Sequence, residues 1–201
     1  MNMKKWLIGI DEAGRGPLAG PVAVGVVKVS SDFDWNLIPG VGDSKQVSAK
    51  MRGEIFKQAK ELKKAGKLDF VVIQMSVKHI DTHGISRSIN VAIERAIMKL
   101  NLTPKNCSIK LDGSLKAPVK FSQETIIKGD SKELVIGLAS ILAKETRDTY
   151  MTSVAKKYPL YELETHKGYG TKRHRHLIYK NGLSDIHRIS YCQNRSLWGK
   201  V

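Results

Sequence analysis

The stretch of sequence that decides the fold is WLIGIDEAGRGP, residues 6–17. Its first part is aromatic and β-branched and is bounded by glycine and proline, which is typical of a buried strand, so we expect a strand over residues 5–10. Two acids, Asp11 and Glu12, follow at once, and a Gly-Arg-Gly turn comes next. That turn carries so little side chain that a large ligand can lie against its backbone. Acids at a strand end beside such a turn predict a metal site next to an anion-binding surface.

Patterns further along the chain extend this strand into a sheet. Residues 21–29 are apolar and β-branched, and the short connection predicts that they pair antiparallel with the first strand. Hydrophobic periodicity predicts strands at residues 68–75, 109–111 and 124–127, and helices at residues 48–65, 85–100 and 131–155. This order predicts an α/β fold with a mixed five-stranded sheet flanked by helices, in which the strand at 109–111 runs parallel to the first strand.

The composition favours a nucleic-acid partner. The chain has 201 residues, of which 41% are hydrophobic, enough for a packed core. Its formal net charge is +15, and an excess of this size favours a polyanionic partner. Nucleic acid is the first candidate, although a ribosomal or membrane-surface protein has a similar charge. The acids after the first strand favour a catalytic role, because a protein that only binds phosphate has no use for clustered carboxylates.

Cysteine content and apolar stretches indicate the cellular compartment. Cys107 and Cys192 do not make a disulfide framework or a zinc site, and we interpret them as reduced thiols. No long apolar segment marks a signal peptide, and the longest apolar stretch, near residues 22–27, is too short to span a bilayer. We expect a cytoplasmic monomer without membrane attachment. The sequence identifies no protein partner.

Four acids are candidate catalytic residues and metal ligands: Asp11, Glu12, Asp112 and Asp130. Asp11 and Asp112 both end predicted strands, and parallel neighbours place their carboxyl ends together, so the topology brings these two side by side. Asp130 begins the long helix that covers the same edge. Each acid also has an ordinary structural interpretation. Glu12 could be a solvated turn residue, Asp112 part of an Asp-Gly turn, and Asp130 an N-cap paired with Glu133.

A cluster of these acids needs a cation. Two carboxylates about 4 Å apart repel by about 4 kcal/mol at an effective dielectric constant of about 20. Oxygen ligands without histidine or cysteine select Mg²⁺ or Mn²⁺ over Zn²⁺. In a basic protein, such a site favours phosphodiester hydrolysis, in which metal ions activate a water and stabilise the leaving oxygen.

Candidate substrate-binding side chains lie on the long helix and in two loops. Ser140, Lys144 and Arg147 are spaced i, i+4 and i+7, so they form one stripe that could hold phosphates. An ordinary solvated face is the structural alternative for this stripe. Lys45 is a similar candidate in a loop. Tyr169 lies between two glycines in a segment dense in cations, which suits stacking on a sugar or base better than core packing.

Taken in order, these motifs resemble the ribonuclease HII family, the type 2 ribonucleases H, over nearly the whole chain. The resemblance depends on residues 11–21 (DEAGRGPLAGP), 43–45 (DSK), 111–113 (LDG), 128–130 (KGD), 139–148 (ASILAKETRD), 166–171 (HKGYGT) and 187–188 (HR). It implies an RNase H-like fold and a two-metal mechanism with Mg²⁺ or Mn²⁺. We expect a single ribonuclease H-like catalytic domain over residues 1–201, with a basic, mainly helical C-terminal extension from about residue 156.

The resemblance also implies an activity. It implies cleavage of the RNA strand of RNA–DNA hybrids and incision at single ribonucleotides in duplex DNA. The cut falls on the 5′ side of the ribonucleotide and leaves 3′-hydroxyl and 5′-phosphate ends, as in ribonucleotide removal and RNA primer processing. The resemblance assigns metal binding to Asp11, Glu12, Asp112 and Asp130. It assigns recognition of the ribose 2′-hydroxyl to the backbone of Gly14, Arg15 and Gly16 and to Tyr169.

Two alternatives remain open at this point. The ribonuclease HIII family is similar but carries an extra N-terminal substrate-binding domain and a Gly-Lys-Gly loop. Here the first strand begins within a few residues of Met1 and the loop is Gly-Arg-Gly, so both details favour ribonuclease HII. A non-catalytic, basic nucleic-acid-binding module would share the charge but would not need the four acids.

Overall fold

Five strands form one mixed sheet in the computed structural model, which describes residues 5–42, 47–194, 196 and 198. The strands lie in the order β3-β2-β1-β4-β5. Their bounds are β1 Trp6–Ala13, β2 Val22–Ser30, β3 Leu68–Met75, β4 Cys107–Asp112 and β5 Ser122–Ile126. β1 pairs antiparallel with β2 and parallel with β4, which confirms the predicted hairpin and the predicted parallel neighbour.

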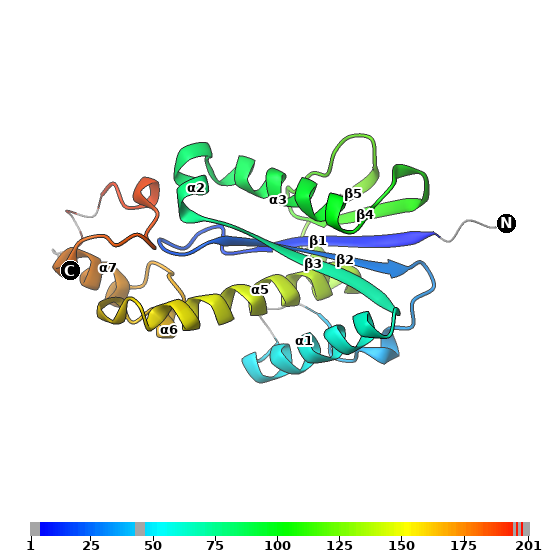
Figure 1. Ribbon diagram of the computed structural model, residues 1–201, viewed down its shortest axis with the longest axis horizontal. Helices are drawn as coiled ribbons and strands as arrows, with labels where there is room; N and C mark the ends of the chain where they lie inside the picture. The colour runs from blue at the N-terminus through cyan, green and yellow to red at the C-terminus, as the bar shows by residue number, and fades with distance from the viewer. Residues whose placement is uncertain (1–4, 43–46, 195, 197, 199–201) are drawn as a thin grey trace.

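Helices cover both faces of the sheet. Their bounds are α1 Ala49–Lys64, α2 Val77–His83, α3 Ile85–Lys99, α4 Gly129–Lys132, α5 Leu134–Ala155, α6 Leu163–His166 and α7 Lys172–Asn181. α2 and α3 lie on one face, and α5 and α1 on the other (Figure 1). α6, α7 and the last described residues gather beyond the carboxyl end of β1 (Figure 1). No helix in the described part of the chain combines the length and apolarity needed to cross a bilayer.

The first strand is longer than predicted. β1 continues through both acids to Ala13, and Glu12 pairs with Val24 in β2. The prediction that the strand stops before Asp11 is therefore wrong, because the hairpin partner supplies backbone pairing that the side-chain pattern does not reveal. Successive side chains of a strand point to opposite faces, so the two acids leave the strand in different directions.

The predicted long helix is broken near its start. α4 ends at Lys132, Glu133 is extended at φ −126° and ψ 112°, and α5 begins at Leu134. Asp130 therefore lies within α4 and is not an N-cap, which corrects the structural alternative given above. The Glu133 side chain pairs with Lys110 of β4 at 2.6 Å. A tertiary ion pair of this kind accompanies the break, and local helix periodicity does not signal it.

α5 lies unusually close to the two central strands because glycines face it. A Cβ built on Gly9 would stand 2.1 Å from the Val135 carbonyl oxygen, and one on Gly25 would stand 2.3 Å from that of Ala139. Only hydrogen fits at these two positions. The contact seats the first half of α5 on β1 and β2, and it thereby places Ser140 beside Asp11.

Candidate active site

A cleft opens where β1 and β4 end. Its volume is about 480 Å³. Its lining consists of Asp11, Glu12, Ala13, Gly14, Arg15, Gly16, Asp112, Asp130, Ser140, Lys144 and Tyr169. The fold therefore brings the four predicted acids to one place, together with most of the predicted substrate-binding residues. Of the rest, Arg147 does not line the cleft, and Lys45 lies outside the described residues.

Asp11 is the most deeply buried of the cleft acids, with 5% of its surface exposed. Burial raises the pKa of Asp11 well above its ordinary value. The nearby carboxylates of Glu12 and Asp112 raise this pKa further, whereas a hydrogen bond from the Ser140 hydroxyl lowers it. The ionised carboxylate is thus held where only a cation or a proton can compensate its charge.

The other acids have internal hydrogen-bond partners. Arg15 Nε donates to Glu12 Oε1 at 2.8 Å, and burial still raises the pKa of Glu12. Asp112 Oδ1 accepts the Gly129 N–H at 2.6 Å, which ties β4 to α4. Among the described residues, no three Asp, Glu, His or Cys side chains converge closely enough to hold one ion. The expected quartet therefore shares a cleft, without forming a closed cage of ligands.

The donor set of the cleft fits a hard divalent cation. Mg²⁺ is usually held by one or two carboxylates together with waters and substrate phosphates, so an open arrangement of acids suits it better than a cage. All four candidate ligands offer oxygen, and the cleft lining contains no histidine or cysteine. Asp11 is a second reason to expect a cation here. Burial of its carboxylate away from water raises its pKa, and a bound cation would offset that cost.

Two residues of the predicted phosphate stripe have structural contacts instead. Arg147 is fully buried and donates to the carbonyl oxygens of Pro21 at 2.9 Å and Ala19 at 3.0 Å. The expectation that it binds substrate is therefore corrected, because a side chain with no exposed surface cannot touch a phosphate. Ser140 lines the cleft but is nearly buried, and its hydroxyl donates to Asp11. In this structure the Ser140 hydroxyl therefore orients the Asp11 carboxylate.

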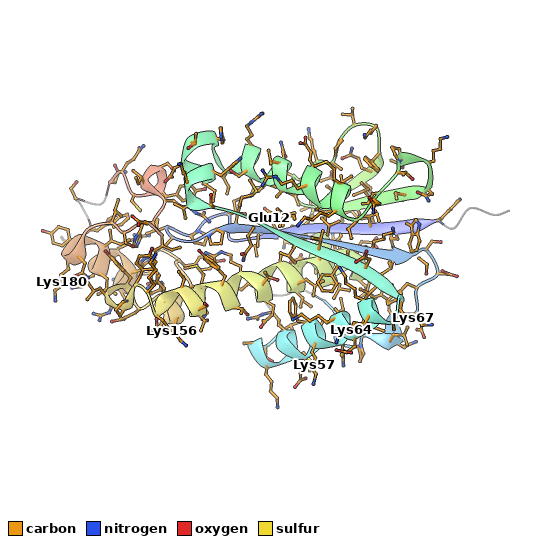
Figure 2. The ribbon with its side chains drawn as sticks, in the orientation of Figure 1. Glu12, Lys57, Lys64, Lys67, Lys156 and Lys180 are labelled. Atoms are coloured by element: carbon orange, nitrogen blue, oxygen red, sulfur yellow. The ribbon has the colours of Figure 1, made fainter. Side chains whose placement is uncertain are left out.

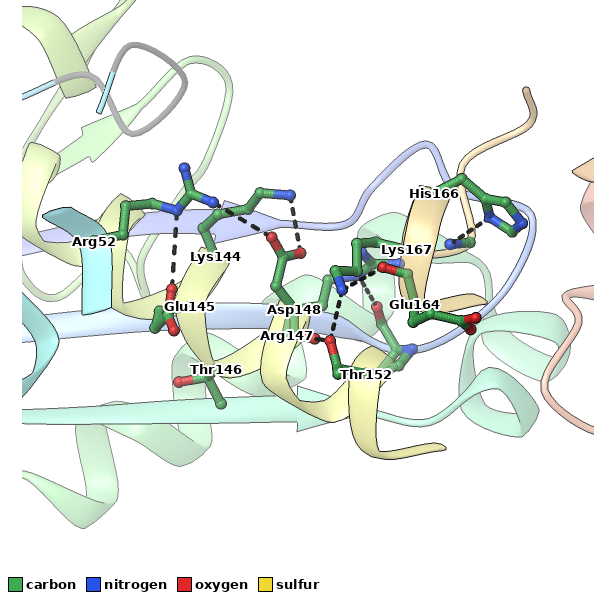
Figure 3. A network of polar contacts seen from close by, with 12 residues as sticks. Arg52, Lys144, Glu145, Thr146, Arg147, Asp148, Thr152, Glu164, His166 and Lys167 are labelled. Atoms are coloured by element: carbon green, nitrogen blue, oxygen red, sulfur yellow. Dashed lines mark hydrogen bonds and ion pairs between the residues drawn. The ribbon is translucent and has the colours of Figure 1, made fainter. Parts of the chain in front are cut away.

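Lys144 and Tyr169 form the basic and aromatic side of the cleft. Lys144 Nζ pairs with Asp148 Oδ1 at 2.9 Å and lies 5.5 Å from the centre of the Tyr169 ring. Figure 3 shows Asp148 between Lys144 and Arg52, which approaches it at 3.7 Å. Tyr169 is 41% exposed. A partly exposed aromatic side chain therefore lies at the mouth of the cleft, beside a lysine held in place by its neighbours.

Sequence reasoning missed four buried residues of the C-terminal segment that support this side of the cleft. They are His166, His174, His187 and Arg188. Arg188 and His187 fall in the His-Arg pair of the resemblance, and His166 and His174 fall in the segment dense in cations. The density of basic residues was the available signal, and it suggested a solvated surface rather than a buried network.

Much of the positive charge lies on the outer surface. Figure 2 labels five lysines at the outer surface, and it labels Glu12, which lines the cleft, near the middle of the view. The lysines are Lys57, Lys64, Lys67, Lys156 and Lys180. These five lysines are exposed. The acids are thus gathered in the cleft of a basic protein, which is an arrangement that attracts a polyanion and presents carboxylates at one point of contact.

An RNase H-like sheet with a carboxylate cleft at the ends of its central parallel strands defines this class of protein as ribonucleases H. Residues 8–194 match the model of the family described as Ribonuclease HII, and the chain belongs to this family. It is therefore an enzyme, a hydrolase of the ribonuclease H type. The alternatives of a ribonuclease HIII and of a non-catalytic module are wrong at the level of the family.

Relatives named ribonuclease HII share much of the sequence. The chain is 45% identical to the protein of Endomicrobium trichonymphae over 184 residues, which cover 91% of this chain and 83% of the relative. It is 40% identical to the protein of Caldicellulosiruptor bescii over 190 residues, which cover 94% and 88% of the two chains. In both comparisons, the similarity thus covers most of this chain and most of the relative.

Solved structures share the fold at lower identity. The ribonuclease H2 of Pyrococcus horikoshii OT3 superposes with a TM-score of 0.74 at 24% identity, covering 98% of this chain and all of the other. An RNase HII of Archaeoglobus fulgidus, solved in a complex with PCNA, gives a TM-score of 0.73 at 24% identity and covers 94% and 96% of the two chains. A Bst-RNase HIII in complex with Mn²⁺ gives 0.68 at 16% identity, covering 96% and 69%.

Proposed function

We propose that this enzyme is a metal-dependent endonuclease that cleaves RNA in RNA–DNA hybrids and incises duplex DNA at single ribonucleotides. The cut falls on the 5′ side of the ribonucleotide and leaves 3′-hydroxyl and 5′-phosphate ends. One observation carries this proposal. The carboxylates that suit a divalent cation, the backbone of the Gly-Arg-Gly loop and an exposed tyrosine ring line the same cleft. Phosphodiester chemistry and recognition of the sugar are therefore possible at one nucleotide.

The four acids are proposed as the ligands of Mg²⁺ or Mn²⁺. When bound, the ions supply an activated water and neutralise charge on the leaving oxygen. Asp11 is held by the Ser140 hydroxyl and Asp112 by the Gly129 amide, so these two carboxylates have fixed orientations. Glu12 is held by Arg15, and it becomes available for a metal when Arg15 turns toward a substrate phosphate. Asp130 closes the cleft from α4.

The Gly-Arg-Gly loop and Tyr169 are proposed to distinguish ribose from deoxyribose. A 2′-hydroxyl is both a donor and an acceptor, so backbone amides and carbonyls can recognise it without a large side chain. Gly16 has no heavy atom near the place where a Cβ would stand, which leaves its backbone open to a sugar. Tyr169 is proposed to stack on the sugar or base beside that loop, and Lys144 to hold a phosphate.

The remaining proposals concern the organisation of the protein. Residues 1–201 are proposed to act as one catalytic domain, in which residues from about 156 form a basic extension that contacts the duplex. This extension is dense in lysine, arginine and histidine between residues 166 and 176. We also propose that the protein acts as a monomer in the cytoplasm, in ribonucleotide removal and RNA primer processing.

A labelled DNA duplex with one ribonucleotide tests the proposed activity. The duplex is incubated with the protein in Mg²⁺, in Mn²⁺ or in chelator, and the ends of the products are mapped. We expect one incision 5′ to the ribonucleotide with either metal and none in chelator. An all-DNA duplex of the same sequence is the control and should stay intact. Cleavage in chelator, or a cut that leaves a 3′-phosphate, would contradict the proposal.

A further inference from the structure

Two buried arginines donate hydrogen bonds to the loop over residues 14–21, which follows β1. Arg188 has no exposed surface and donates three hydrogen bonds to this loop. Its Nη2 donates to the Gly14 carbonyl oxygen at 2.7 Å, its Nη1 to that of Arg15 at 2.9 Å, and its Nε to that of Gly20 at 2.9 Å. A single planar guanidinium therefore fixes three peptide groups of the loop, the two within the Gly-Arg-Gly turn and one near the end of the loop.

Arg147 adds two more bonds from α5. Its Nε and Nη2 donate to the carbonyl oxygens of Pro21 and Ala19. Gly14, at φ +90°, packs directly on this side chain, and a Cβ there would stand 2.1 Å from Arg147 Nε. The arginine therefore leaves no room for a side chain at position 14. Between them, the two guanidinium groups bind five carbonyl oxygens of residues 14–21.

This arrangement is not a set of salt bridges. Neither guanidinium lies within 4.0 Å of a carboxylate oxygen in the described part of the chain. Burial lowers the pKa of Arg188 to about 10 and also lowers that of Arg147. Asp148 and Asp81 act on Arg147 and Arg188 from a longer distance and offset only part of this shift, so burial of the two charges remains costly. An apolar side chain would avoid this cost but would remove the donors to five carbonyl oxygens of the loop. The two arginines therefore fix the path of the loop backbone.

The bonds to carbonyl oxygens determine where the amides of the loop point. In a trans peptide group, the C=O and the following N–H point in opposite directions. Because the Gly14 and Arg15 carbonyls point back to Arg188, the N–H groups of Arg15 and Gly16 point the other way. Both residues line the cleft on that other side. Neither amide has an acceptor among the described residues, so both are available to a ligand.

We propose that Arg188, assisted by Arg147, is a positioning residue that sets the discrimination between ribose and deoxyribose by aiming the Arg15 and Gly16 amides into the cleft. The inference rests on the proposed function, because it assigns those amides to the 2′-hydroxyl. Tyr191 supports the same peptide group. Its hydroxyl donates to the Arg15 carbonyl oxygen at 3.1 Å, and its ring lies 5.0 Å from the Arg188 guanidinium carbon.

The test measures selectivity separately from stability. In an Asp130→Asn background, which prevents cleavage, fluorescence anisotropy gives Kd for two duplexes that differ only in one 2′-hydroxyl. Arg188→Lys keeps the charge but cannot reach three carbonyls. We expect the ratio of the two Kd values to fall about tenfold, with the all-DNA duplex bound as before. Arg87→Lys, at an exposed position on α3, is the matched control and should leave the ratio unchanged.

A second variant covers the case in which Arg188→Lys does not fold. Tyr191→Phe removes only the hydroxyl that donates to Arg15, and we expect it to lower the same ratio about threefold. A ratio unchanged in both variants would overturn the role of Arg188 while leaving the proposed function intact. If Arg188→Lys does not fold, an unchanged ratio of Kd values in Tyr191→Phe would by itself overturn the role of Arg188. A parent protein that binds both duplexes equally would overturn the sugar recognition and this inference together.

Discussion

Two regions on opposite sides of the loop over residues 14–21 bury ionisable groups, but the buried groups have different roles in the two regions. The acid edge, formed by Asp11, Glu12, Asp112 and Asp130, leaves the deepest carboxylate without a counter-charge. The C-terminal cluster, formed by His166, His174, His187 and Arg188, buries its groups with partners for nearly every polar atom. Burial without compensation marks a place for a ligand, whereas burial with nearly complete hydrogen bonding marks a support.

His174 and His187, two of the three histidines of the C-terminal cluster, are linked in one chain of neutral rings. The Ser184 amide donates to His187 Nδ1 at 3.1 Å, and the Nε2 atoms of His187 and His174 are 3.2 Å apart. His174 Nδ1 is 2.9 Å from the Tyr169 carbonyl oxygen. One proton between the two Nε2 atoms and one on His174 Nδ1 satisfy all these contacts. Burial lowers the pKa of His174 to about 3 and that of His187 to about 4.

Replacement of the deepest acid gives the largest expected effect. Asp11→Asn removes a proposed metal ligand, and we expect turnover of the single-ribonucleotide duplex to fall by about 10³-fold or more. The same variant should unfold at a higher temperature than the parent in chelator at neutral pH. Because the pKa of Asp11 is raised, its ionisation destabilises the fold as the pH rises, and asparagine removes that ionisation.

The control for this variant is Asp69→Asn, an exposed acid paired with Lys63. It should change neither turnover nor the thermal unfolding midpoint measurably. If Asp11→Asn is less stable than the parent in chelator, the acid edge is compensated like the C-terminal cluster, and the comparison fails.

Close backbone packing holds the acid edge together, so a methyl group at Gly25 should disrupt it. A Cβ there would stand 2.3 Å from a carbonyl oxygen of α5. We expect Gly25→Ala to lower the free energy of unfolding by about 3 kcal/mol in urea titrations. Gly53→Ala, at a helical position in α1 with no atom closer than 4.0 Å, should raise it by about 0.5–1 kcal/mol. Equal effects of the two changes would contradict the packing argument.

Acid should destabilise the C-terminal cluster first. Histidines with a lowered pKa bind protons in the unfolded chain before they do so in the fold, so stability falls as the pH drops below about 6.5. The expected loss is about 1.4 kcal/mol per pH unit for each histidine down to about pH 4. Urea titrations between pH 7.5 and 4.5 measure it. Asp11 and Glu12 respond with the opposite sign, so the loss is measured as the difference between the parent and a His174→Gln variant. Equal pH dependence of the two proteins would show that burial does not lower the pKa of His174.

Tyr169 joins the two regions, and its removal should have the smallest effect on the fold. Its ring lines the cleft while its carbonyl oxygen accepts from His174. We expect Tyr169→Ala to slow incision at a single ribonucleotide by about tenfold, since stacking on one base or sugar contributes about 1–3 kcal/mol. The thermal midpoint should change little, because the ring is largely outside the core. Unchanged incision would remove Tyr169 from the site.

The resemblance of local motifs identified the acid edge well and the C-terminal cluster poorly. Asp11 and Asp112 are adjacent because β1 and β4 are parallel neighbours, and strand patterns are sufficient to predict that. Arg147 shows the opposite case. Its helical spacing from Ser140 and Lys144 predicts a shared surface, yet the loop over residues 14–21 covers it. Helical spacing gives the direction of a side chain but not what lies against it.

By itself, the sequence determined the succession of strands along the chain, the two neighbours of β1, the set of acids and the basic net charge, because these depend on residue type and on neighbours in the chain. Only the tertiary structure decided which buried charges have partners. Arg147 and Arg188 bind carbonyl groups 126 to 174 residues away, and the folding of the whole chain brings those groups together. A hydrogen bond between distant segments leaves no periodic trace in the sequence, so the supports of the site became visible only in three dimensions.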